Sequence, residues 1–335
     1  MSFYIYEYYS LVRGYRVFTK MLRFIQKILY YFCLLLQYPI ICTLILNDTK
    51  ATEYITIGTS ASGSGYNNTG NNICRILNHN RDKLDIRCKV IESMGSKENA
   101  ELLRKGEIDF AILQADWQKS SFYGNSDLYD IEKDAKIRFV TALYDEELAI
   151  IVRRDSKINL FQDLQGKIIN IGETGTRATF QSIIQYYGWD KKVFTGIREL
   201  HGEQQVSALC NGSVDAIATI SGTPNKVVED VSRACEIKLI QVDGNAISAL
   251  TSKHNEFRSA TIPGGTYPGI PNNINTVSVL AVLSTSEDVS EGTVYKISEI
   301  LNKNLNMQKK GEFQQNDGKT ATPHKGAVKF TQNSN

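Results

Sequence analysis

From residue 54 onward, short apolar runs of strand length alternate with amphipathic segments of helical spacing. Three runs are predicted as buried strands: Tyr54–Gly58, Ile86–Glu92 and Ile108–Gln114. The segments between them, Thr69–Asn78 and Ser96–Lys105, are predicted as helices. Strand–helix–strand units with short connections indicate a mostly parallel sheet covered by helices.

The alternation starts again after an acidic turn, Asp145-Glu146-Glu147, which is predicted between two β-rich stretches, Ile137–Tyr144 and Leu148–Arg153. The second series contains the strands Lys167–Gly172, Val214–Thr219, Ile237–Val242 and Val277–Leu283, and the helices Thr176–Tyr187, Glu203–Cys210, Asn225–Arg233, Ile247–Ser252 and Val289–Leu305. A chain of 335 residues is long enough for two lobes. We therefore predict an α/β fold with lobe I at 52–144 plus 244–335 and lobe II at 145–243. Two crossings, near Asp145 and Asp243, would form a hinge, with a ligand cleft between the lobes.

The first 51 residues are predicted to be a leader. An uncharged apolar run at 28–46 follows Arg23 and Lys27 and precedes a polar exit, as in a secretory signal. Met21 would start a leader of conventional length. A retained membrane anchor is the alternative, because the run has 19 residues. Either version places the rest of the chain outside the cytoplasm.

Composition and charge narrow the classes of function. Hydrophobic residues are 42% and charged residues 22% of the chain, which is ordinary for a folded protein. The net charge of +2 comes from the leader, since the chain after residue 50 carries 32 basic and 34 acidic residues. A basic groove for nucleic acid is therefore not expected.

Four cysteines follow the leader: Cys74, Cys88, Cys210 and Cys235. They fall into two pairs separated by a long gap, so the disulfides Cys74–Cys88 and Cys210–Cys235 would each stay within one lobe of an exported protein. Four buried thiols are the alternative. No spacing typical of a metal site occurs, and no cofactor is predicted.

The glycine-rich loop Gly58–Tyr66 carries the strongest sign of a ligand site. It joins a predicted strand to a helix N-terminus, where free amide groups and the helix dipole favour an anion. Its hydroxyls and Tyr66 can hydrogen-bond to a ligand. The plain alternative is a solvated turn with Thr69 capping the helix. Neither GxGxxG, a P-loop nor GxSxG is present here, so the loop gives no indication of an enzyme.

Three further segments follow predicted strands and would face the same cleft. Gln114 ends the strand IDFAIL, GETGTR follows KIINIG, and the segment from Ser221 to Pro224 follows VDAIAT. Each segment alone is weak evidence, but their common position at the carboxyl ends of strands indicates one site.

Four blocks of the sequence resemble the TAXI family, the extracytoplasmic solute receptors of TRAP transporters. They are GTSASGSGYNNTGNNIC, ESMGSKENAELLRKGEIDFAILQAD, ATIPGGTYPGIPNNINTVSVLAVL and PHKGAVKF, and they occur in this order between about Glu53 and Phe330. The chain departs from the family at Asn68, where Pro is usual, at Ser60-Ala61, where Gly-Gly is favoured, and at Lys325, where Pro is usual. The GETGTR loop is about two residues shorter than its counterpart.

This resemblance implies a type II periplasmic-binding-protein fold and no catalysis. It implies delivery of a small carboxylate or amino acid, such as glutamate, glutamine or a 2-oxoacid, to a membrane permease. The ligand-binding residues carried over by position are Thr59, Ser60, Tyr66, Gln114, Gly175, Thr176, Ser221, Pro224 and Tyr267. A membrane-tethered sensory or surface-antigen domain of the same fold is the alternative function.

Overall fold

The computed structural model describes residues 21, 25–29, 52–124, 129–172, 174–304 and 319–334. Nearly all of the predicted leader, including most of the apolar run 28–46, lies outside these residues. The chain divides into a small unit, Met1–Tyr54 with Asn80–Arg87, and a large unit, Ile55–His79 with Cys88–Asn335. Within the small unit, α4 (Arg81–Leu84) ends at Asp85, whose carbonyl accepts a 2.7 Å hydrogen bond from the Glu53 amide.

The described strands form one sheet in the order β2-β1-β3-β10-β4-β7-β5-β6, with β8 paired to β4 and β9 paired to β10. Their bounds are β1 Glu53–Gly58, β2 Ile86–Ile91, β3 Phe110–Gln114, β4 Ile137–Arg153, β5 Ile168–Asn170, β6 Gly196–Arg198, β7 Ala216–Ser221, β8 Ile237–Ile240, β9 Phe257–Ile262 and β10 Ile274–Ser286. The remaining helices are α3 Gly65–His79, α5 Ser96–Arg104, α6 Ala115–Tyr123, α7 Thr174–Gln185, α8 Gly202–Cys210, α9 Lys226–Ala234, α10 Asn245–Lys253, α11 Glu291–Asn304 and α12 Lys325–Ser334. Two 3₁₀ turns, Phe161–Leu164 and Lys191–Val193, complete the set.

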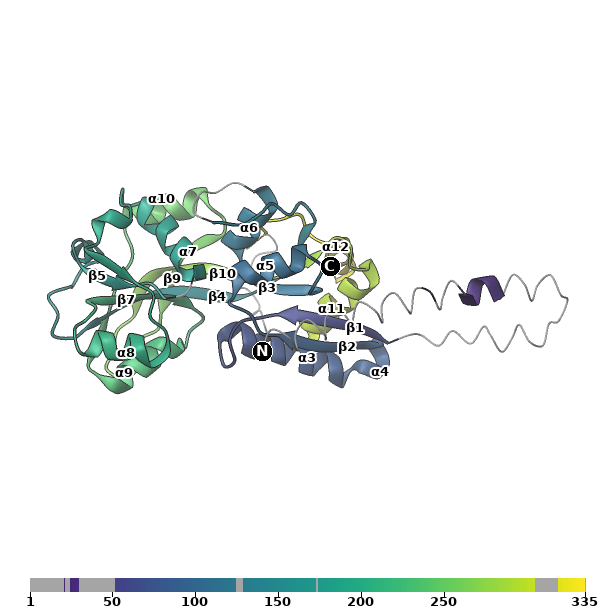
Figure 1. Ribbon diagram of the computed structural model, residues 1–335, viewed down its shortest axis with the longest axis horizontal. Helices are drawn as coiled ribbons and strands as arrows, with labels where there is room; N and C mark the ends of the chain where they lie inside the picture. Colours follow the sequence, from purple (N-terminus) through teal and green to yellow (C-terminus); the bar gives the residue numbers. More distant parts are fainter. Residues whose placement is uncertain are drawn as a thin grey trace. The chain divides into compact units, whose positions relative to one another are not determined.

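In the first lobe, helices lie on both faces of β3. Ala111 and Leu113 share a core cluster with Ala100 and Leu103 of α5, whereas Ile112 lies on the face toward α3, near Gly70. Figure 1 shows α5 and α6 on one side of β3 and α3 on the other. The buried run FAILQ of β3 has no polar alternation, as expected of a strand covered on both faces.

The second lobe repeats this arrangement around β5 and β7. Helices α7 and α10 lie on one side of the sheet, and α8 and α9 lie on the other (Figure 1). On the α8–α9 side, Leu209, Val228 and Val231 pack against Ile217 of β7. The chain therefore forms two α/β lobes, as predicted for the type II periplasmic-binding-protein fold.

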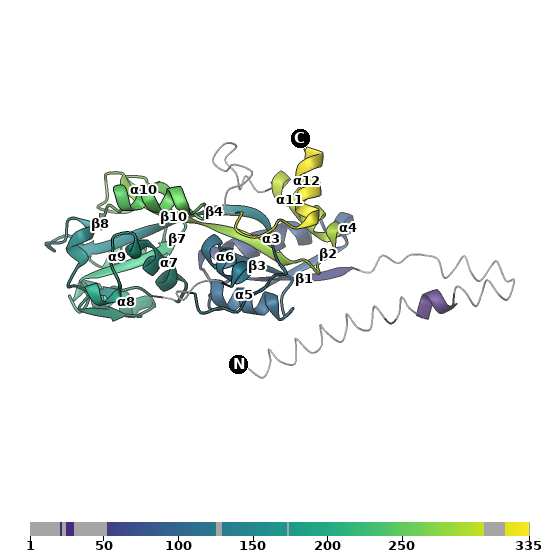
Figure 2. The ribbon, with the colours of Figure 1, turned by 90° about the horizontal axis from the view of Figure 1, so that it is seen from above.

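Two long strands, β4 and β10, belong to both lobes (Figure 2). The first part of β4 pairs with β10, and its last part, from Glu147 to Arg153, pairs antiparallel with β7 and β8. Similarly, β10 pairs with β9 over Ile274–Val279 and with β3 over Ala281–Thr285. One strand that belongs to both lobes thus contains Asp145, and the other is β10. The predicted lobe bounds at residues 144 and 243 stay a prediction.

The acidic segment Asp145-Glu146-Glu147 is not a turn. It lies inside the continuous 17-residue strand β4, with Glu146 opposite Val279 of β10. Three adjacent carboxylates suggested an exposed reversal, but the backbone groups here complete the ladders that join the lobes. The two β-rich stretches predicted around the turn are therefore one strand.

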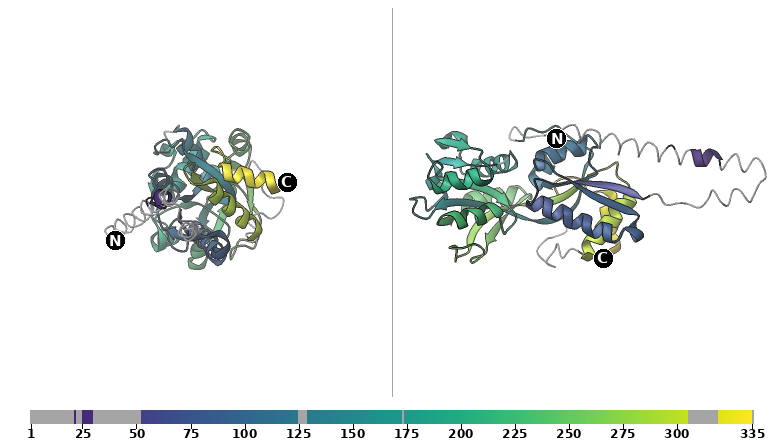
Figure 3. Two further views of the ribbon diagram at one scale, coloured as in Figure 1. Left: turned by 90° about the vertical axis from the view of Figure 1, so that its right-hand side faces the viewer. Right: turned by 60° about the horizontal axis from the view of Figure 1, so that its bottom comes forward.

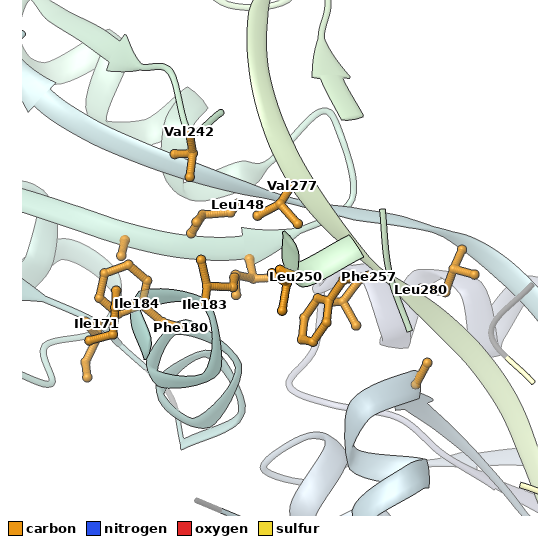
Figure 4. Packing of buried hydrophobic residues seen from close by; sticks show 14 of the residues in the cluster. Leu148, Ile171, Phe180, Ile183, Ile184, Val242, Leu250, Phe257, Val277 and Leu280 are labelled. Carbon is orange, nitrogen blue, oxygen red and sulfur yellow. The ribbon is translucent and has the colours of Figure 1, made fainter. Parts of the chain in front are cut away.

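The core continues along these crossing strands. Leu148 and Val277, from β4 and β10, pack in one cluster with Ile183 of α7 and with Leu250 and Phe257 of the α10–β9 segment. Figure 4 shows these side chains converging beside the crossing strands. At the C-terminus, α12 packs against α11 so closely that a Cβ on Gly326 would lie 2.3 Å from the Glu291 carbonyl oxygen (Figure 3).

Candidate functional site

The glycine-rich loop leads directly into α3, which begins at Gly65 and not at the predicted Thr69. Ser64 caps the helix: its hydroxyl accepts a 3.2 Å hydrogen bond from the Asn67 amide, and its carbonyl accepts a 2.9 Å bond from the Asn68 amide. The amides of Gly65 and Tyr66 therefore lie in the first turn, where an α-helix provides no carbonyl for them.

The hydroxyls of the loop are used within the protein. Thr59 is fully buried and donates a 3.1 Å hydrogen bond to the Ile91 carbonyl. The hydroxyl oxygens of Ser60 and Ser64 are 2.5 Å apart. These contacts fix the shape of the loop, so Thr59 and Ser60, predicted as ligand donors, act on the loop itself in this structure.

Tyr66 connects the helix N-terminus to the crossing strand β4. Its hydroxyl donates a 3.0 Å hydrogen bond to Oε2 of Glu146 and lies 3.2 Å from the Ser96 hydroxyl. Ser96 in turn accepts a 3.1 Å hydrogen bond from the Gln114 amide at the end of β3. Tyr66, Gln114 and Glu146 are each less than a tenth exposed. Two predicted ligand residues thus meet around a buried carboxylate.

Residues of the second lobe reach the same place. A Cβ built on Gly65 would lie 3.1 Å from the Tyr144 hydroxyl and 3.8 Å from the Ser221 hydroxyl. The β ladder places Ser221, the last residue of β7, opposite Glu147 of β4. The backbone of the first-lobe loop, the crossing strand and the end of a second-lobe strand therefore converge at Gly65. A larger residue at this position would require the Tyr144 side chain to shift.

The other predicted site residues lie further along the second-lobe loops. The Tyr267 hydroxyl accepts a 2.6 Å hydrogen bond from the Asn225 amide, and Thr223 donates a 2.9 Å bond to Glu147. Tyr267 therefore holds the loop that contains Pro224. Gly175 and Thr176 lie in the first turn of α7, and Thr176 is half-buried.

Beside Gln114, Asp116 forms a compact polar cluster. One Asp116 oxygen, Oδ2, accepts hydrogen bonds of 2.6 Å from both the Tyr129 and the Thr179 hydroxyls. The Thr179 hydroxyl also lies 3.0 Å from Oε1 of Gln114. Because Thr179 belongs to α7, this cluster ties the second lobe to the end of β3.

Burial sets the electrostatics of the site. It raises the pKa of Glu146 to about 8, although hydrogen bonds from Tyr66 and Gln114 favour the charged form, and the charges of Asp116 and Glu147 raise it further. Burial likewise raises the pKa of Glu147 to about 7 and that of Asp116 to about 6. Glu146 makes no ion pair within the part of the chain that the structure describes.

Tyr144 is a further buried titratable group of the site. Its hydroxyl is buried and forms no hydrogen bond of ordinary geometry among the described residues, although the Thr69 hydroxyl lies near enough to lower its pKa slightly. Burial, and then the nearby Glu146 carboxylate, raise the pKa of this hydroxyl well above its usual value. Alternation along β4 places the side chains of Tyr144 and Glu146 on the same face of the strand.

Sequence reasoning missed Tyr144, Glu146 and Glu147 as site residues. Glu146 and Glu147 were visible as part of an acidic run between two apolar stretches. Charged residues in a segment of otherwise strand-like pattern are the signal that could have identified them, since carboxylates are rarely buried without a reason.

Among the described residues, no group of three or more His, Cys, Asp or Glu side chains is placed to hold a metal ion, and no helix has the length and apolar character to span a bilayer. The four described cysteines are joined in two disulfides, Cys74–Cys88 and Cys210–Cys235. The first links α3 to β2, and the second links the ends of α8 and α9.

Several solved structures are similar to this chain. The periplasmic aliphatic sulphonate binding protein SsuA from Escherichia coli is 12% identical with a TM-score of 0.47, over 75% of this chain and 70% of that one. A putative L-cystine ABC transporter from Listeria monocytogenes is 15% identical with a TM-score of 0.46, over 75% and 89%. The GluR0 ligand-binding core from Nostoc punctiforme, in complex with L-glutamate, is 12% identical with a TM-score of 0.45, over 76% and 95%.

Likenesses at this level say nothing about the ligand of this chain. The match to a protein-family model covers more of the chain than these structural likenesses do. The family model of the NMT1-like family matches residues 57–330, which include both lobes and every residue of the site described above. The chain therefore belongs to the NMT1-like family.

Proposed function

We propose that this protein is an extracytoplasmic solute-binding protein without catalytic activity. It would capture a small carboxylate or amino acid, glutamate-like, glutamine-like or a 2-oxoacid, between its lobes and deliver it to a TRAP-type membrane permease. The observation that carries the proposal is the convergence at Gly65 of the N-terminus of α3, Tyr144 of the crossing strand and Ser221 of the second lobe. Groups from both lobes around one point suit a ligand that is enclosed when the lobes close.

The type of site supports binding rather than catalysis. The loop offers amide groups at a helix N-terminus, which suit a carboxylate. The hydroxyls of Thr59, Ser60 and Ser64 make hydrogen bonds to the Ile91 carbonyl or to each other, and none of these bonds is to a histidine or a lysine that would activate a nucleophile. The groups available to a solute therefore bind and orient it.

The two disulfides support a location outside the cytoplasm. Disulfides persist in oxidising compartments and are rare in reducing ones. Since each pair lies within one lobe, these disulfides would not hinder movement of the lobes. A permease as partner, and its TRAP type, follow from the resemblance to the TAXI family alone.

Calorimetric titration of the full chain with amino acids, dicarboxylates and 2-oxoacids tests the proposal. We expect saturable 1:1 binding within one chemical class. At 100 times the dissociation constant, such a ligand should stabilise the protein by about 2.7 kcal/mol. A cooperatively folded protein that binds no member of the panel would contradict a solute-binding function and favour a surface or sensory role.

A further inference from the structure

The buried carboxylate of Glu146 narrows the class of ligand. Glu146 lies in β4, is 4% exposed and accepts a 3.0 Å hydrogen bond from the Tyr66 hydroxyl. The nearby acid Asp145 is neutralised by Arg258, whose Nε and second terminal nitrogen donate bonds of 2.7 and 2.9 Å. No such cation faces Glu146 among the described residues. A buried carboxyl group without a positive partner keeps its proton, and it becomes charged when a cation is placed beside it.

An independent observation points to the same location. The buried Tyr144 hydroxyl, which forms no hydrogen bond of ordinary geometry within the described residues although the Thr69 hydroxyl lies near it, is on the same face of β4 as Glu146. Its oxygen is 3.1 Å from the position of a Cβ on Gly65, and therefore adjoins the first turn of α3. Tyr144 thus offers an unused acceptor between the carboxylate and the helix N-terminus.

We infer that the solute carries a protonated amino group, bound by the Glu146 carboxylate and the Tyr144 hydroxyl oxygen, while its carboxylate lies at the N-terminus of α3. An ammonium group has three donors and needs acceptors, which these two side chains supply. The amides of Gly65 and Tyr66 then face the negative end of the same molecule. This inference rests on the solute-binding function proposed above and restricts it to amino acids, at the expense of 2-oxoacids and dicarboxylates.

The opposite chemistry would be a protonated Glu146 that donates a hydrogen bond to a ligand carboxylate. The two cases differ in whether Glu146 releases its proton when the ligand binds. Besides the neutral amide of Gln114, the titratable groups around Glu146 are acidic, namely Asp116 and Glu147, or phenolic, namely Tyr66 and Tyr144. The free protein should therefore hold a proton on Glu146 near pH 7, which an ammonium ligand would expel and a carboxylate ligand would retain.

Matched pairs of probes test the inference: L-glutamate with 2-oxoglutarate, L-alanine with pyruvate, and L-leucine with 4-methyl-2-oxopentanoate. Each pair differs chiefly in the ammonium group. We expect the amino acid of at least one pair to bind the full chain about 30-fold or more tightly than its oxoacid. Calorimetry in two buffers of different ionisation enthalpy should show release of up to one proton per bound amino acid at pH 7. Affinity should rise between pH 6 and pH 8.5.

The variant Glu146→Gln separates the two chemistries, because an amide resembles the protonated carboxyl group. It should weaken amino-acid binding about 30-fold or more and abolish proton release. Glu299→Gln, at an exposed helix position paired with Lys303, is the matched control and should behave as the wild type. A Glu146→Gln protein that melts cooperatively is required for this comparison, and the amide, which resembles the protonated carboxyl group, suits the same buried position.

Equal or tighter binding of the oxoacids, or unchanged amino-acid affinity in Glu146→Gln, would overturn the inference and leave solute binding intact. Absence of binding by every member of every pair would instead refute an amino-acid receptor. If the dicarboxylates of the wider panel then bound, solute binding would stand and the inference alone would be wrong.

Discussion

The hydroxyl of Thr179 donates a 2.6 Å hydrogen bond to Oδ2 of Asp116, which joins α7 of the second lobe to the residue that follows β3 in the first. Both side chains are buried, and the same hydroxyl lies 3.0 Å from Oε1 of Gln114. This contact bridges the lobes immediately beside the candidate ligand site. It therefore couples the stability of the fold to the distance between the lobes.

Thr179→Val should lower the free energy of unfolding by about 1–3 kcal/mol, because it leaves the buried Asp116 with one donor fewer. Urea denaturation measures this loss. The control is Thr331→Val in α12, where the hydroxyl donates only to the Ala327 carbonyl one turn earlier; it should cost less than about 0.5 kcal/mol. Similar losses in the two variants would show that the contact between the lobes contributes no more to the free energy of unfolding than a hydroxyl bond within one helix.

Stability of the free protein should fall as the pH rises from about 5 to 8.5. Glu146, with a pKa of about 8, and Glu147, with a pKa of about 7, bind protons more tightly in the folded state than in the unfolded chain. Above the ordinary carboxyl pKa and up to these values, the folded state holds more protons, so stability decreases with pH. Below that range the effect is absent, and above it the loss is complete.

Urea denaturation at several pH values should show this slope, worth on the order of a few kcal/mol in total. In Glu146→Gln the slope should be clearly shallower, since that group no longer titrates. A wild-type stability that is flat or rises between pH 5 and pH 8.5 would mean that neither carboxyl group holds its proton in the folded protein.

Gly70→Ala should destabilise the protein by about 1–3 kcal/mol. Its Cβ would lie 2.4 Å from Cγ2 of the fully buried Thr59 and 3.2 Å from Cγ1 of Val90, so α3 would have to move away from the sheet. Thermal unfolding monitored by circular dichroism would measure the change.

The matched control is Gly292→Ala in α11, where the nearest atom outside its own helix is the Ser290 hydroxyl at 4.0 Å. Alanine there should leave stability unchanged or increase it by up to about 1 kcal/mol, because the unfolded chain loses freedom. Comparable effects at the two glycines would contradict the close approach of α3 to β1.

Loss of the Cys210–Cys235 disulfide should cost about 2–4 kcal/mol. The two cysteines are 25 residues apart, and the bond limits the freedom of the unfolded chain between the ends of α8 and α9. Denaturation of the double variant Cys210→Ser, Cys235→Ser measures this cost. Mass spectrometry of unreduced peptides from the wild-type protein tests the pairing itself, and peptides that contain free thiols at these positions would contradict it.

Local pattern alone determined much of the first lobe. The apolar runs at β1, β2 and β3, the spacing of α5 and the alternation of strands with helices specify a sheet covered on both faces, because each segment must bury its own apolar side. Short or polar elements were missed. β6 has three half-buried or exposed residues, β9 alternates weakly, and α12 follows a polar tail, so their structure depends on the neighbours that they meet.

The residues of the candidate site also fall into those that the sequence predicted and those that only the tertiary structure revealed. The sequence identified the glycine-rich loop, Gln114 and Ser221, because small and polar residues after buried strands mark the edge where ligands bind. The roles of Tyr144 and Glu146 were decided only by tertiary structure. Whether Asp145-Glu146-Glu147 turns back or continues as a strand depends on pairing with β10 and β7, more than 70 residues further along the chain. Local residues cannot specify such long-range pairing, and burial of the Glu146 carboxylate is its consequence.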